Sequence, residues 1–478
     1  MKSKVLKRLV SFIIVLVILG TLLTPMSIAA NKVNVANGSY TLISALNNSK
    51  CLDVSGAGTT NGTNIQLWTK NETVAQKFTI YKVSGDWYSI RNLDSAKAID
   101  VQGGNRKSGV NVQLWEWNGT DAQLWRFFDA GNGYYYIQNK LGYYLDVSGG
   151  KTADGTNVWV YSGNSTNAQK WKLAINDGIY TITSKLSSSK RLDVSGAGAN
   201  NGTNIQLWSA NNSVAQSFLI AKYNKTEWFE IINVASKKAV DVQGGKSGSG
   251  VNVQLWERNR TNAQLWRFIP VGDGYYYIQN KLGYYLDVSG GKTADGTNVW
   301  VYSGNSTNAQ KWKIELKDLT AEILVDLCIN LHYDFSSVSG NTLLVLMDFY
   351  KLFNHNKKYD IKQEARWNSF FDDIIYPGYY SAVLFKNDIM DPEQLGNMIY
   401  GYSGNHLGMS NRTIFQGGGY AASGSKYLNN PALYYGDSET DHYFIQKGIN
   451  LRGNKNIKID VDLSTVPGWL LDIIKNIL

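Results

Sequence analysis

A stretch of forty residues occurs twice in this chain without a single difference, at residues 133–172 and again at 274–313. A copy of that length marks an internal duplication, so the repeat constrains the fold more than any other feature of the sequence does. Each copy is the last third of a larger region built on one recurring frame. The frame is Asp-Val, an aromatic residue fifteen positions after the Asp, and a Gln-x-Trp or Gln-x-Phe that begins eight positions later. It occurs six times, three times in each half of the repeat region.

The Asp and aromatic positions of the frame line up across all six units. They are Asp53 and Trp68, Asp100 and Trp115, Asp146 and Tyr161, Asp193 and Trp208, Asp241 and Trp256, and Asp287 and Tyr302. A carboxylate can accept charge-assisted hydrogen bonds, and an aromatic ring offers an apolar face. These twelve residues are therefore candidate binding residues. Turn capping is the alternative for the Asp residues, and simple packing is the alternative for the aromatic residues.

The closing pairs of the frame have a different predicted role. They are Gln76/Phe78, Gln123/Trp125, Gln169/Trp171, Gln216/Phe218, Gln264/Trp266 and Gln310/Trp312. We predict that these pairs belong to the hydrophobic core, because large aromatic residues at a fixed place in every repeat are typical of shared packing.

Short alternating strands between Gly, Asn and Ser turns predict that the repeat region is all-β. Successive Asp positions are 46 to 48 residues apart. A unit of that size cannot bury its own apolar face, so three neighbouring units must share one core. We therefore expect two compact all-β domains, at residues 30–175 and 176–315.

The motifs Leu-Asp-Val, Asn-Gly-Thr-Asn-Ile-Gln-Leu-Trp and Gln-x-Trp, repeated in threes over about residues 38–314, resemble the ricin-type β-trefoil lectin family. The resemblance implies a twelve-stranded trefoil in each half, with a sugar pocket available in each unit. In such a pocket the frame Asp would accept hydrogen bonds from sugar hydroxyls, and the frame aromatic residue would cover the C–H face of the sugar. This sequence departs from the family at the position before the Gln of Gln-x-Trp, where the family commonly has Asn. All six units have Ala there: Ala75, Ala122, Ala168, Ala215, Ala263 and Ala309.

Two further departures affect specificity. A polar residue one place earlier can substitute in the second and third units, where it is Asp121, Asn167, Asn262 or Asn308. The first units have Val74 and Val214 at that place, so we expect their sites to be the weakest. The third units carry Trp159 and Trp300 where the other units carry Gln66, Gln113, Gln206 and Gln254. Galactose specificity is therefore not carried over from the family.

Residues 1–29 have the features of a secretory signal peptide. Four basic residues precede an apolar run at 9–23, and Ser27 and Ala29 are the small residues of a cleavage site. The alternative is that this segment stays uncleaved as a membrane anchor. No later stretch is apolar enough to span a membrane. We expect a secreted protein, extracellular or associated with the cell wall. Cys51 and Cys328 lie in different predicted domains and are expected to remain free, buried thiols.

The hydrophobic period changes after residue 315. Apolar residues over 319–331 fit one helical face, and a second helix is predicted at 342–353. Gly-rich and Tyr-rich turns follow, with a strand at 380–385 and a helix from Ser438 to about Asn450. Residues 316–478 are therefore predicted to form a smaller α+β domain. The expected fold class is multidomain, with two all-β β-trefoils followed by this domain.

An ordered series of motifs over about residues 355–452 resembles the bacterial polymorphic toxin type 44 family. The series comprises Asp360-Ile-Lys362, Trp367, the Gly-rich stretch 396–408, Gly417-Gly418-Gly419, and Gly436-Asp437-x-x-x-Asp441-His442. The resemblance implies a toxin or effector domain, which in the family is usually described as a predicted nuclease. It also makes an immunity protein a candidate partner.

The candidate catalytic residues of this domain are Asp437, Asp441, His406, Asn397 and Tyr400. If Asp437 begins a helix, Asp441 lies one turn further on the same face, where two carboxylates can share a proton or hold a divalent metal. The alternative is that Asp437 only caps the helix and Asp441 is solvated. His406 is the candidate general acid or base. No His-x-x-x-His or Glu pairing supports zinc, so no cofactor is assigned and the metal ligands are not identified.

The charge is unevenly distributed along the chain. Residues 31–315 contain 29 basic and 20 acidic residues, a net charge of +9, whereas residues 316–478 contain 14 basic and 18 acidic residues, a net charge of −4. Nucleic-acid binding normally needs a positive surface, so the C-terminal charge disfavours a nucleic-acid target. We expect a carbohydrate-binding protein that brings a hydrolytic effector to glycans or polysaccharides on a cell surface. The alternatives are a nuclease toxin that acts on RNA and a non-enzymatic lectin or adhesin.

Overall fold

The computed structural model describes residues 28–224 and 226–320, and parts of the C-terminal region. These parts are residues 323, 331, 349, 352–353, 359–364, 366–367, 376–386, 388–423, 430–431, 434 and 437–452. The predicted signal peptide and the predicted helices at 319–331 and 342–353 lie almost wholly outside the described residues, as does Cys328. Cys51 is buried and free.

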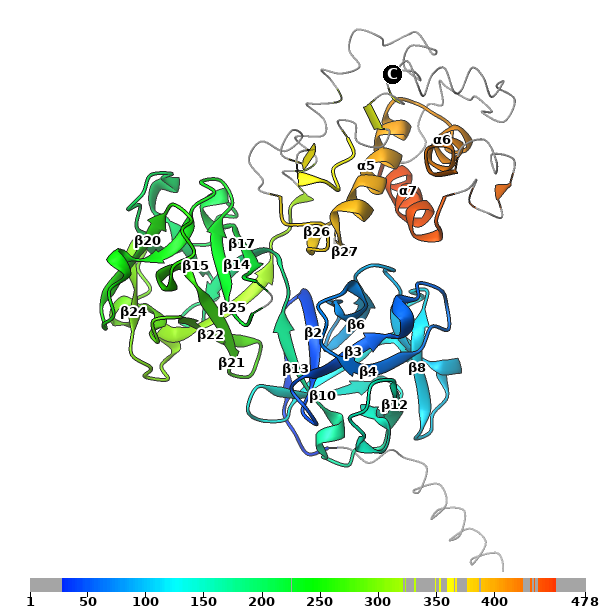
Figure 1. Ribbon diagram of the computed structural model, residues 1–478, viewed down its shortest axis with the longest axis horizontal. Helices are drawn as coiled ribbons and strands as arrows, with labels where there is room; N and C mark the ends of the chain where they lie inside the picture. The colour runs from blue at the N-terminus through cyan, green and yellow to red at the C-terminus, as the bar shows by residue number, and fades with distance from the viewer. Residues whose placement is uncertain are drawn as a thin grey trace, which may run out of the picture. The chain divides into compact units, whose positions relative to one another are not determined.

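The first repeat half forms one extended antiparallel arrangement of short strands (Figure 1). The strands are β1 (Lys32–Val33), β2 (Gly38–Ser44), β3 (Lys50–Val54), β4 (Ile65–Thr69), β5 (Phe78–Ser84), β6 (Trp87–Asn92), β7 (Ala98–Val101), β8 (Val110–Trp115), β9 (Trp125–Asp129), β10 (Tyr134–Asn139), β11 (Tyr144–Val147), β12 (Thr156–Tyr161) and β13 (Lys170–Ile175).

Six of these strands close into a ring. The pairs are β2 with β5, β5 with β6, β6 with β9, β9 with β10, β10 with β13, and β13 with β2. The remaining hairpins, β3–β4, β7–β8 and β11–β12, meet at one end of this barrel through β4–β12 and β12–β8 pairings. A closed barrel with three capping hairpins is the β-trefoil, as the repeat pattern predicts.

The second repeat half repeats the plan with twelve strands. They are β14 (Gly178–Ser184), β15 (Lys190–Val194), β16 (Ile205–Ser209), β17 (Phe218–Lys222), β18 (Phe229–Asn233), β19 (Ala239–Val242), β20 (Val251–Trp256), β21 (Trp266–Pro270), β22 (Tyr275–Asn280), β23 (Tyr285–Val288), β24 (Thr297–Tyr302) and β25 (Lys311–Leu316). Here the ring runs β14, β17, β18, β21, β22 and β25. The predicted fold class of two trefoils is therefore confirmed, although the exact domain boundaries remain predictions.

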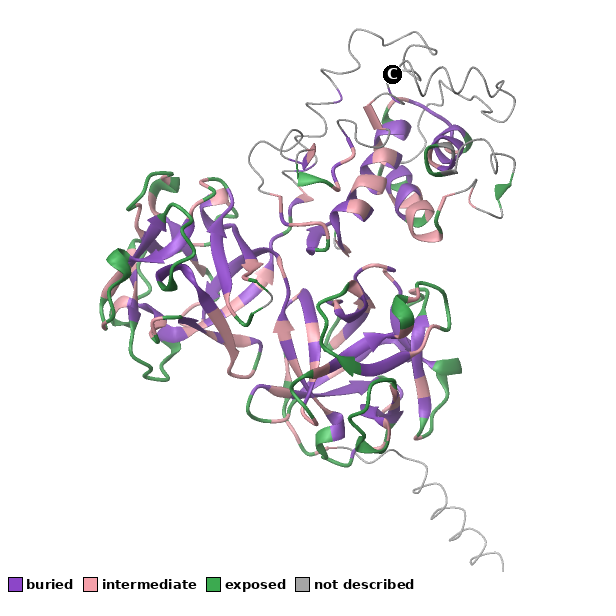
Figure 2. Cartoon of the chain, viewed as in Figure 1, coloured by how far each residue is buried: buried purple, intermediate pink, exposed green. Residues whose placement is uncertain are grey.

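The core of each trefoil is built from the strand faces that turn inward (Figure 2). The Gln-x-Trp prediction is confirmed, because Trp125, Trp171, Trp266 and Trp312 are fully buried. The indole nitrogen of Trp125 donates to the carbonyl oxygen of Ile99 at 3.2 Å. Each glutamine of these pairs is buried as well and holds the loop before it, as Gln76 does by accepting from the backbone N–H of Asn71.

Neighbouring units of a trefoil are joined by hydrogen bonds that involve the chain beside each exposed aromatic residue. The backbone N–H of Glu116, next to Trp115, donates to the side chain of Asn61 at 2.8 Å. The backbone N–H of Ser162 donates to Ser108, and that of Thr69 donates to Asp154. Each hairpin therefore fixes the aromatic residue of another unit, and the second trefoil repeats the three contacts.

The described part of the C-terminal domain contains a small hairpin and three helices (Figure 1). The elements are β26 (Val383–Phe385), β27 (Asp388–Met390), α5 (Pro392–His406), α6 (Asn411–Ser423) and α7 (Glu439–Arg452). The predicted strand at 380–385 is present over Val383–Phe385, and the helix predicted from Ser438 begins at Glu439. The helices at 392–406 and 411–423 were not predicted.

Glycines explain why that stretch is helical despite its composition. A Cβ at Gly401 would overlap the carbonyl oxygen of Ile445, and a Cβ at Gly448 would overlap that of Met398. The two glycines therefore allow the backbones of α5 and α7 to touch where the helices cross. Tertiary packing has overridden a low helix propensity. No helix among the described residues is long and apolar enough to cross a membrane.

Candidate functional site

The six frame aspartates lie on the capping hairpins, and each faces a residue of the partner strand. Asp53 on β3 is opposite Gln66 on β4, and Asp100 on β7 is opposite Gln113 on β8. The amide nitrogen of Gln66 donates to Asp53 Oδ1 at 2.9 Å, and that of Gln76 donates to Oδ2 at 3.0 Å. The carboxylate is therefore held in one orientation by neutral donors.

The third units achieve the same orientation with a different donor. Trp159 stands opposite Asp146, and its indole N–H donates to Asp146 Oδ1 at 2.7 Å. Trp300 donates to Asp287 Oδ1 at 2.8 Å in the second trefoil. The tryptophans noted in the sequence thus replace a glutamine amide with an indole. They also stack on the neighbouring tyrosines, with 5.7 Å between the ring centroids of Trp159 and Tyr161.

The aspartates are buried, whereas the aromatic residues beside them are exposed. All six Asp side chains are 4% to 6% exposed, and all six aromatic residues are 37% to 39% exposed. The 3-10 turn after β3 (Ser55–Ala57) has Val54 as its N-cap residue and no side-chain cap, so the contacts of Asp53 do not support turn capping. Each unit presents an outward ring next to a fixed acceptor, the combination expected of a sugar site.

Burial affects the charge state of these carboxyl groups. It raises the pKa of Asp53, Asp100, Asp146, Asp193 and Asp241, while the hydrogen bonds from Gln or Trp act in the opposite direction. The neighbouring donors stabilise the ionised form, which is the form that accepts hydrogen bonds from sugar hydroxyls.

One of the six sites opens into a cavity of about 920 Å³. Asp241, Gln254 and Trp256 lie in its wall, together with Lys246 and Asn262. Asn262 is one of the polar residues that the sequence offered as a substitute for the missing family Asn. Lys246 is not one of the recurring residues of the frame and was not predicted. Its position five residues after the Asp could have indicated it.

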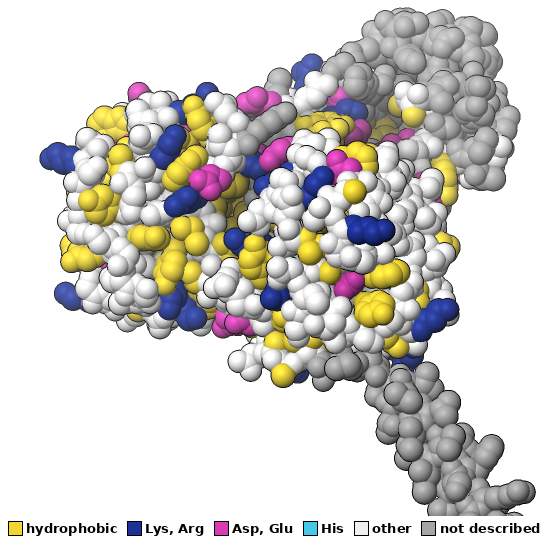
Figure 3. Space-filling view, turned by 60° about the horizontal axis from the view of Figure 1, so that its bottom comes forward, with side chains coloured by type: hydrophobic (Ala, Val, Ile, Leu, Met, Phe, Trp, Pro, Cys, Tyr) yellow, Lys and Arg dark blue, Asp and Glu magenta, His cyan; other side chains and the backbone are white. Residues whose placement is uncertain are grey.

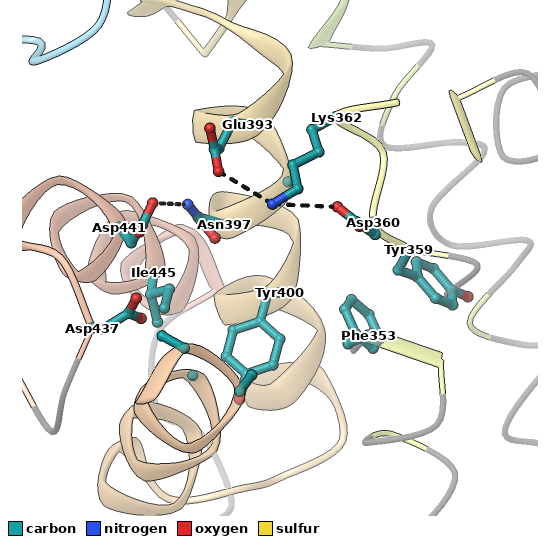
Figure 4. Close-up of a pocket in the computed structure, with 14 residues that line it drawn as sticks. Phe353, Tyr359, Asp360, Lys362, Glu393, Asn397, Tyr400, Asp437, Asp441 and Ile445 are labelled. Carbon is teal, nitrogen blue, oxygen red and sulfur yellow. Dashed lines mark hydrogen bonds and ion pairs between the residues drawn. The ribbon is translucent and has the colours of Figure 1, made fainter. Parts of the chain in front are cut away.

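The C-terminal domain contains a second cavity, of about 230 Å³ (Figure 4). Four of the five predicted catalytic residues line it: Asn397, Tyr400, Asp437 and Asp441. They come from α5 and α7 and the residues just before α7. The fifth, His406, is exposed at the end of α5, where it stacks on Tyr402 and is not part of the wall. The structure therefore does not bring His406 to the other four.

Asp437 and Asp441 interact directly. Burial, and then the charge of Asp441, raise the pKa of Asp437 to about 7. Burial also raises the pKa of Asp441, which accepts hydrogen bonds from Ser438, Asp437 and Asn397. The pair can therefore share one proton, with Asp437 as the protonated partner and Asp441 as the carboxylate.

The cap of α7 differs from the alternative offered by the sequence. The backbone N–H of Asp441 donates to the Ser438 hydroxyl at 3.0 Å, and that of His442 donates to the Ser438 carbonyl. Ser438, rather than Asp437, is the N-cap, because its side chain satisfies the first turn. Asp437 precedes the helix and is available to the cavity.

Tyr400 and His442 have other contacts. The Tyr400 hydroxyl donates to the carbonyl oxygen of Ile414 at 2.8 Å, and burial raises its pKa far above the usual value. Its ring therefore shapes the cavity, while its hydroxyl proton is already engaged. His442 stacks on Phe415 at 4.1 Å between centroids, and burial lowers its pKa.

Three charged residues of the cavity, Asp360, Lys362 and Glu393, were not among the predicted catalytic residues. Lys362 lies 3.3 Å from Glu393 and 3.9 Å from Asp360, on the side of the cavity opposite Tyr400 and Phe353 (Figure 4). The Tyr379 hydroxyl also donates to Glu393. Within the described residues, no three His, Cys, Asp or Glu side chains are grouped so that they could hold a metal ion.

Comparison with known proteins identifies the repeat region. The family model for the ricin-type beta-trefoil lectin domain-like family matches residues 29–115, 74–141, 121–208 and 214–302, more than half of the chain. The chain belongs to this family. Its trefoils are lectin domains, the class of domain that binds carbohydrate.

Solved structures include similar trefoils. The designed three-fold symmetric protein ThreeFoil is 33% identical over 29% of this chain and 98% of its own, with a TM-score of 0.28. A mosquitocidal holotoxin is 19% identical over 60% of this chain and 35% of its own, with a TM-score of 0.28. The Rhizoctonia solani agglutinin is 24% identical over 30% of this chain and 96% of its own, with a TM-score of 0.27. No curated protein matches the chain.

Proposed function

We propose that this protein is a secreted, multivalent lectin that holds a hydrolytic effector domain on glycan-coated surfaces. The observation that carries the proposal is the sixfold pairing of a buried, oriented Asp with an exposed aromatic residue. Several weak sugar sites on one chain increase retention through effective concentration, without stronger contacts at any single site. A polysaccharide or a dense surface glycan is therefore the expected partner.

Retention by polysaccharide tests the lectin part. The full chain should bind an immobilised polysaccharide about 10²-fold or more tightly than the corresponding monosaccharide binds in solution. Calorimetry with the monosaccharide and surface retention with the polymer give the two affinities. Equal affinities for both would remove the multivalent mechanism, and absence of binding to any glycan on an array would remove the lectin function.

The effector part of the proposal rests on the pair Asp437 and Asp441. A protonated carboxyl beside an ionised one supplies both an acid and a base, which is the requirement for general acid–base hydrolysis. Asn397 orients Asp441 through its side-chain amide. The resemblance to the type 44 toxins supports a toxic activity and an immunity protein that protects the producing cell. The net charge of −4 over residues 316–478 favours a glycan or envelope substrate over nucleic acid.

A divalent metal at the carboxylate pair remains part of this proposal as an alternative mechanism. Asp437 and Asp441 would be its ligands, because carboxylate oxygens suit Mg²⁺ and Ca²⁺. Activity that survives dialysis against a chelator would favour proton sharing, and activity restored only by added metal would favour metal binding.

The site of action can be tested in bacteria with the full chain and with a version that lacks residues 1–29. Killing only by the secreted version supports an envelope hydrolase, and killing only by the retained version supports the nuclease alternative. If neither version kills, and the purified chain still binds polysaccharide, the protein is a non-enzymatic lectin. The Asp441→Asn variant is the control, because killing that depends on the site should disappear with it.

A further inference from the structure

The two trefoils carry one informative difference at the cavity beside Asp241. Its twelve wall residues have counterparts 141 positions earlier in the first trefoil, and ten of the twelve are identical. The two exceptions are Lys246, which replaces Asn105, and Asn262, which replaces Asp121. One wall therefore contains Asp241 and Lys246, whereas the corresponding residues of the first trefoil include two carboxylates, Asp100 and Asp121.

The lysine side chain has the same conformation in three units. Lys246 folds back so that its Cε would lie 3.6 Å from a Cβ at Gly244. Lys151 and Lys292, five residues after Asp146 and Asp287, lie 3.7 Å and 3.6 Å from the equivalent positions at Gly149 and Gly290. Each lysine is followed in its unit by the matching Asn: Asn167, Asn262 and Asn308. Lys246 lines the same cavity as Asp241, and Lys151 and Lys292 have the same position in the sequence and the same fold-back over the glycine turn of their units.

The first trefoil's second unit arranges its charges differently, with Asp121 in place of Asn262 and with Arg106 and Lys107 in place of Ser247 and Gly248. Asp121 forms an ion pair with Lys140 at 2.9 Å and lies 3.8 Å from Arg106. Its carboxylate therefore neutralises the positive groups of Lys140 and Arg106, with which an anionic ligand would otherwise pair. The first units have Gly58 and Gly198 at the lysine position and are neutral there.

Two arginines near the Asp241 cavity are paired with a buried carboxylate. The loop that contributes Asn262 also carries Arg258 and Arg260, which lie 2.9 Å and 3.5 Å from the buried carboxylate of Glu230. The counterparts in the first trefoil are Trp117 and Gly119. In the space-filling view, Lys and Arg side chains are spread over the visible face rather than joined into a continuous stripe (Figure 3).

We propose that the three lysine-bearing sites, at Lys151, Lys246 and Lys292, bind sugars that carry an acidic group, whereas the other three bind neutral sugars. The proposal rests on the lectin function proposed above. The Asp and aromatic residue of each site hold the hydroxyls and the C–H face. The lysine ammonium then pairs with a carboxylate or sulfate on the same sugar, and the wall Asn offers it an uncharged neighbour.

Reciprocal exchange between the trefoils tests this inference. One variant of the full chain, Lys246→Asn with Asn262→Asp, gives the second trefoil the first trefoil's wall. The other, Asn105→Lys with Asp121→Asn, makes the opposite change. The probes are three oligosaccharides that differ only in the terminal sugar, which is glucose, glucuronic acid or glucose 6-sulfate. Calorimetry at low salt gives the number of sites that prefer the acidic probes.

Three such sites per chain are expected in the wild type, two in the first variant and four in the second. Each lysine should improve the affinity for an acidic probe by up to about fivefold, since it pairs at an exposed rim. The preference should fall as salt is raised, because the charges are screened. A preference for only one acidic probe tells carboxylate from sulfate.

The failure of this inference can be told from the failure of the lectin proposal. Acidic and neutral probes that bind equally in all three proteins would overturn the inference and leave the lectin function intact. A wild type that binds none of the three probes and no glycan on an array would overturn both. Unchanged thermal melting of the variants shows that altered binding does not come from lost folding.

Discussion

The trefoil aspartates and the C-terminal aspartates are all partly removed from water, but they have different neighbours. Asp53 accepts from two side-chain amides, and Asp146 accepts from an indole. Neutral donors of this kind fix a carboxylate and act against the rise in pKa that burial causes. For Asp437, by contrast, burial and then the charge of the neighbouring carboxylate Asp441 both raise the pKa. The comparison indicates that burial acts alike in both regions, and that the partner of the buried carboxylate decides whether this effect is opposed or reinforced.

The largest expected effect is on the proton-transfer side of this comparison. Asp441→Asn should reduce the activity of the C-terminal domain by roughly 10²- to 10⁴-fold, the usual contribution of a general acid or base. Asn still allows Ser438 to cap α7, so the melting temperature should change little. The matched control is Glu439→Gln, which removes a carboxylate from the same turn outside the cavity wall. Full activity in Asp441→Asn would contradict the role of Asp441 as a general acid or base, and the reactive residues of this domain would then be unidentified.

The framework that positions the pair depends on the crossing of α5 and α7. Gly448→Ala should destabilise the C-terminal domain by about 1–3 kcal/mol or more, because the new methyl group overlaps the backbone at Met398. Gly396→Ala is the matched control on α5, since its Cβ would lie at an ordinary 3.5 Å from Ile361. That change should be neutral or stabilising by up to about 1 kcal/mol. Thermal melts of the two variants would contradict the account if both behaved alike.

The pH dependence of stability distinguishes the two kinds of carboxylate further. The pKa of Asp437 in the folded protein, about 7, is above its ordinary value of 3.8, so the folded state holds this proton more tightly. Its stabilisation is complete below pH about 4 and is lost as the pH rises toward 7. The melting temperature of the C-terminal domain should therefore decrease as the pH is raised from 5 to 8, and Asp437→Asn should make this decrease smaller. A wild-type melting temperature that increases over the same pH range would contradict a shared proton.

The smallest expected effect is an exchange of neutral donors. Trp159→Gln with Trp300→Gln gives the third units the amide that the other four units use. The carboxylates of Asp146 and Asp287 should stay oriented, and the fold should survive. Loss of the stacked ring should weaken third-unit binding by about 0.5–1.5 kcal/mol, measured by calorimetry. Loss of all third-unit binding would mean that the indole has a role beyond that of a donor and a packing surface.

The trefoils could be predicted from sequence because the signal repeats. Asp53, Trp68 and their counterparts occur at the same spacing six times, so geometry that is ambiguous in one unit is fixed by the others. The role of Gln66 and Trp159 as donors was not predicted, because pairing across a hairpin becomes visible only when the strand register is known. Lys246 was missed because it lies outside the repeat frame, although a lysine five residues after the Asp recurs in three units.

The C-terminal domain was harder to predict because its signals are tertiary. Its glycines indicate turns from local propensity, yet Gly401 and Gly448 serve a helix crossing. The four-residue spacing of Asp437 and Asp441 correctly suggested that they meet, although Ser438 rather than Asp437 begins the helix. His406 was grouped with them because histidine often transfers protons, but its place at the end of α5 is set by helix length.

Binding by the trefoil aspartates is the most direct measurement of the account. Changing Asp100, Asp146, Asp241 and Asp287 together to Asn should leave the fold intact and reduce retention on the polysaccharide by about 10²-fold or more, because only the two weaker first-unit sites remain. The same exchange at Asp53 and Asp193 is the matched control and should have a much smaller effect. Retention that is unchanged in the fourfold variant, and lost in the control, would place binding in the first units. Full retention in both would contradict the assignment of these aspartates as the sugar-binding residues.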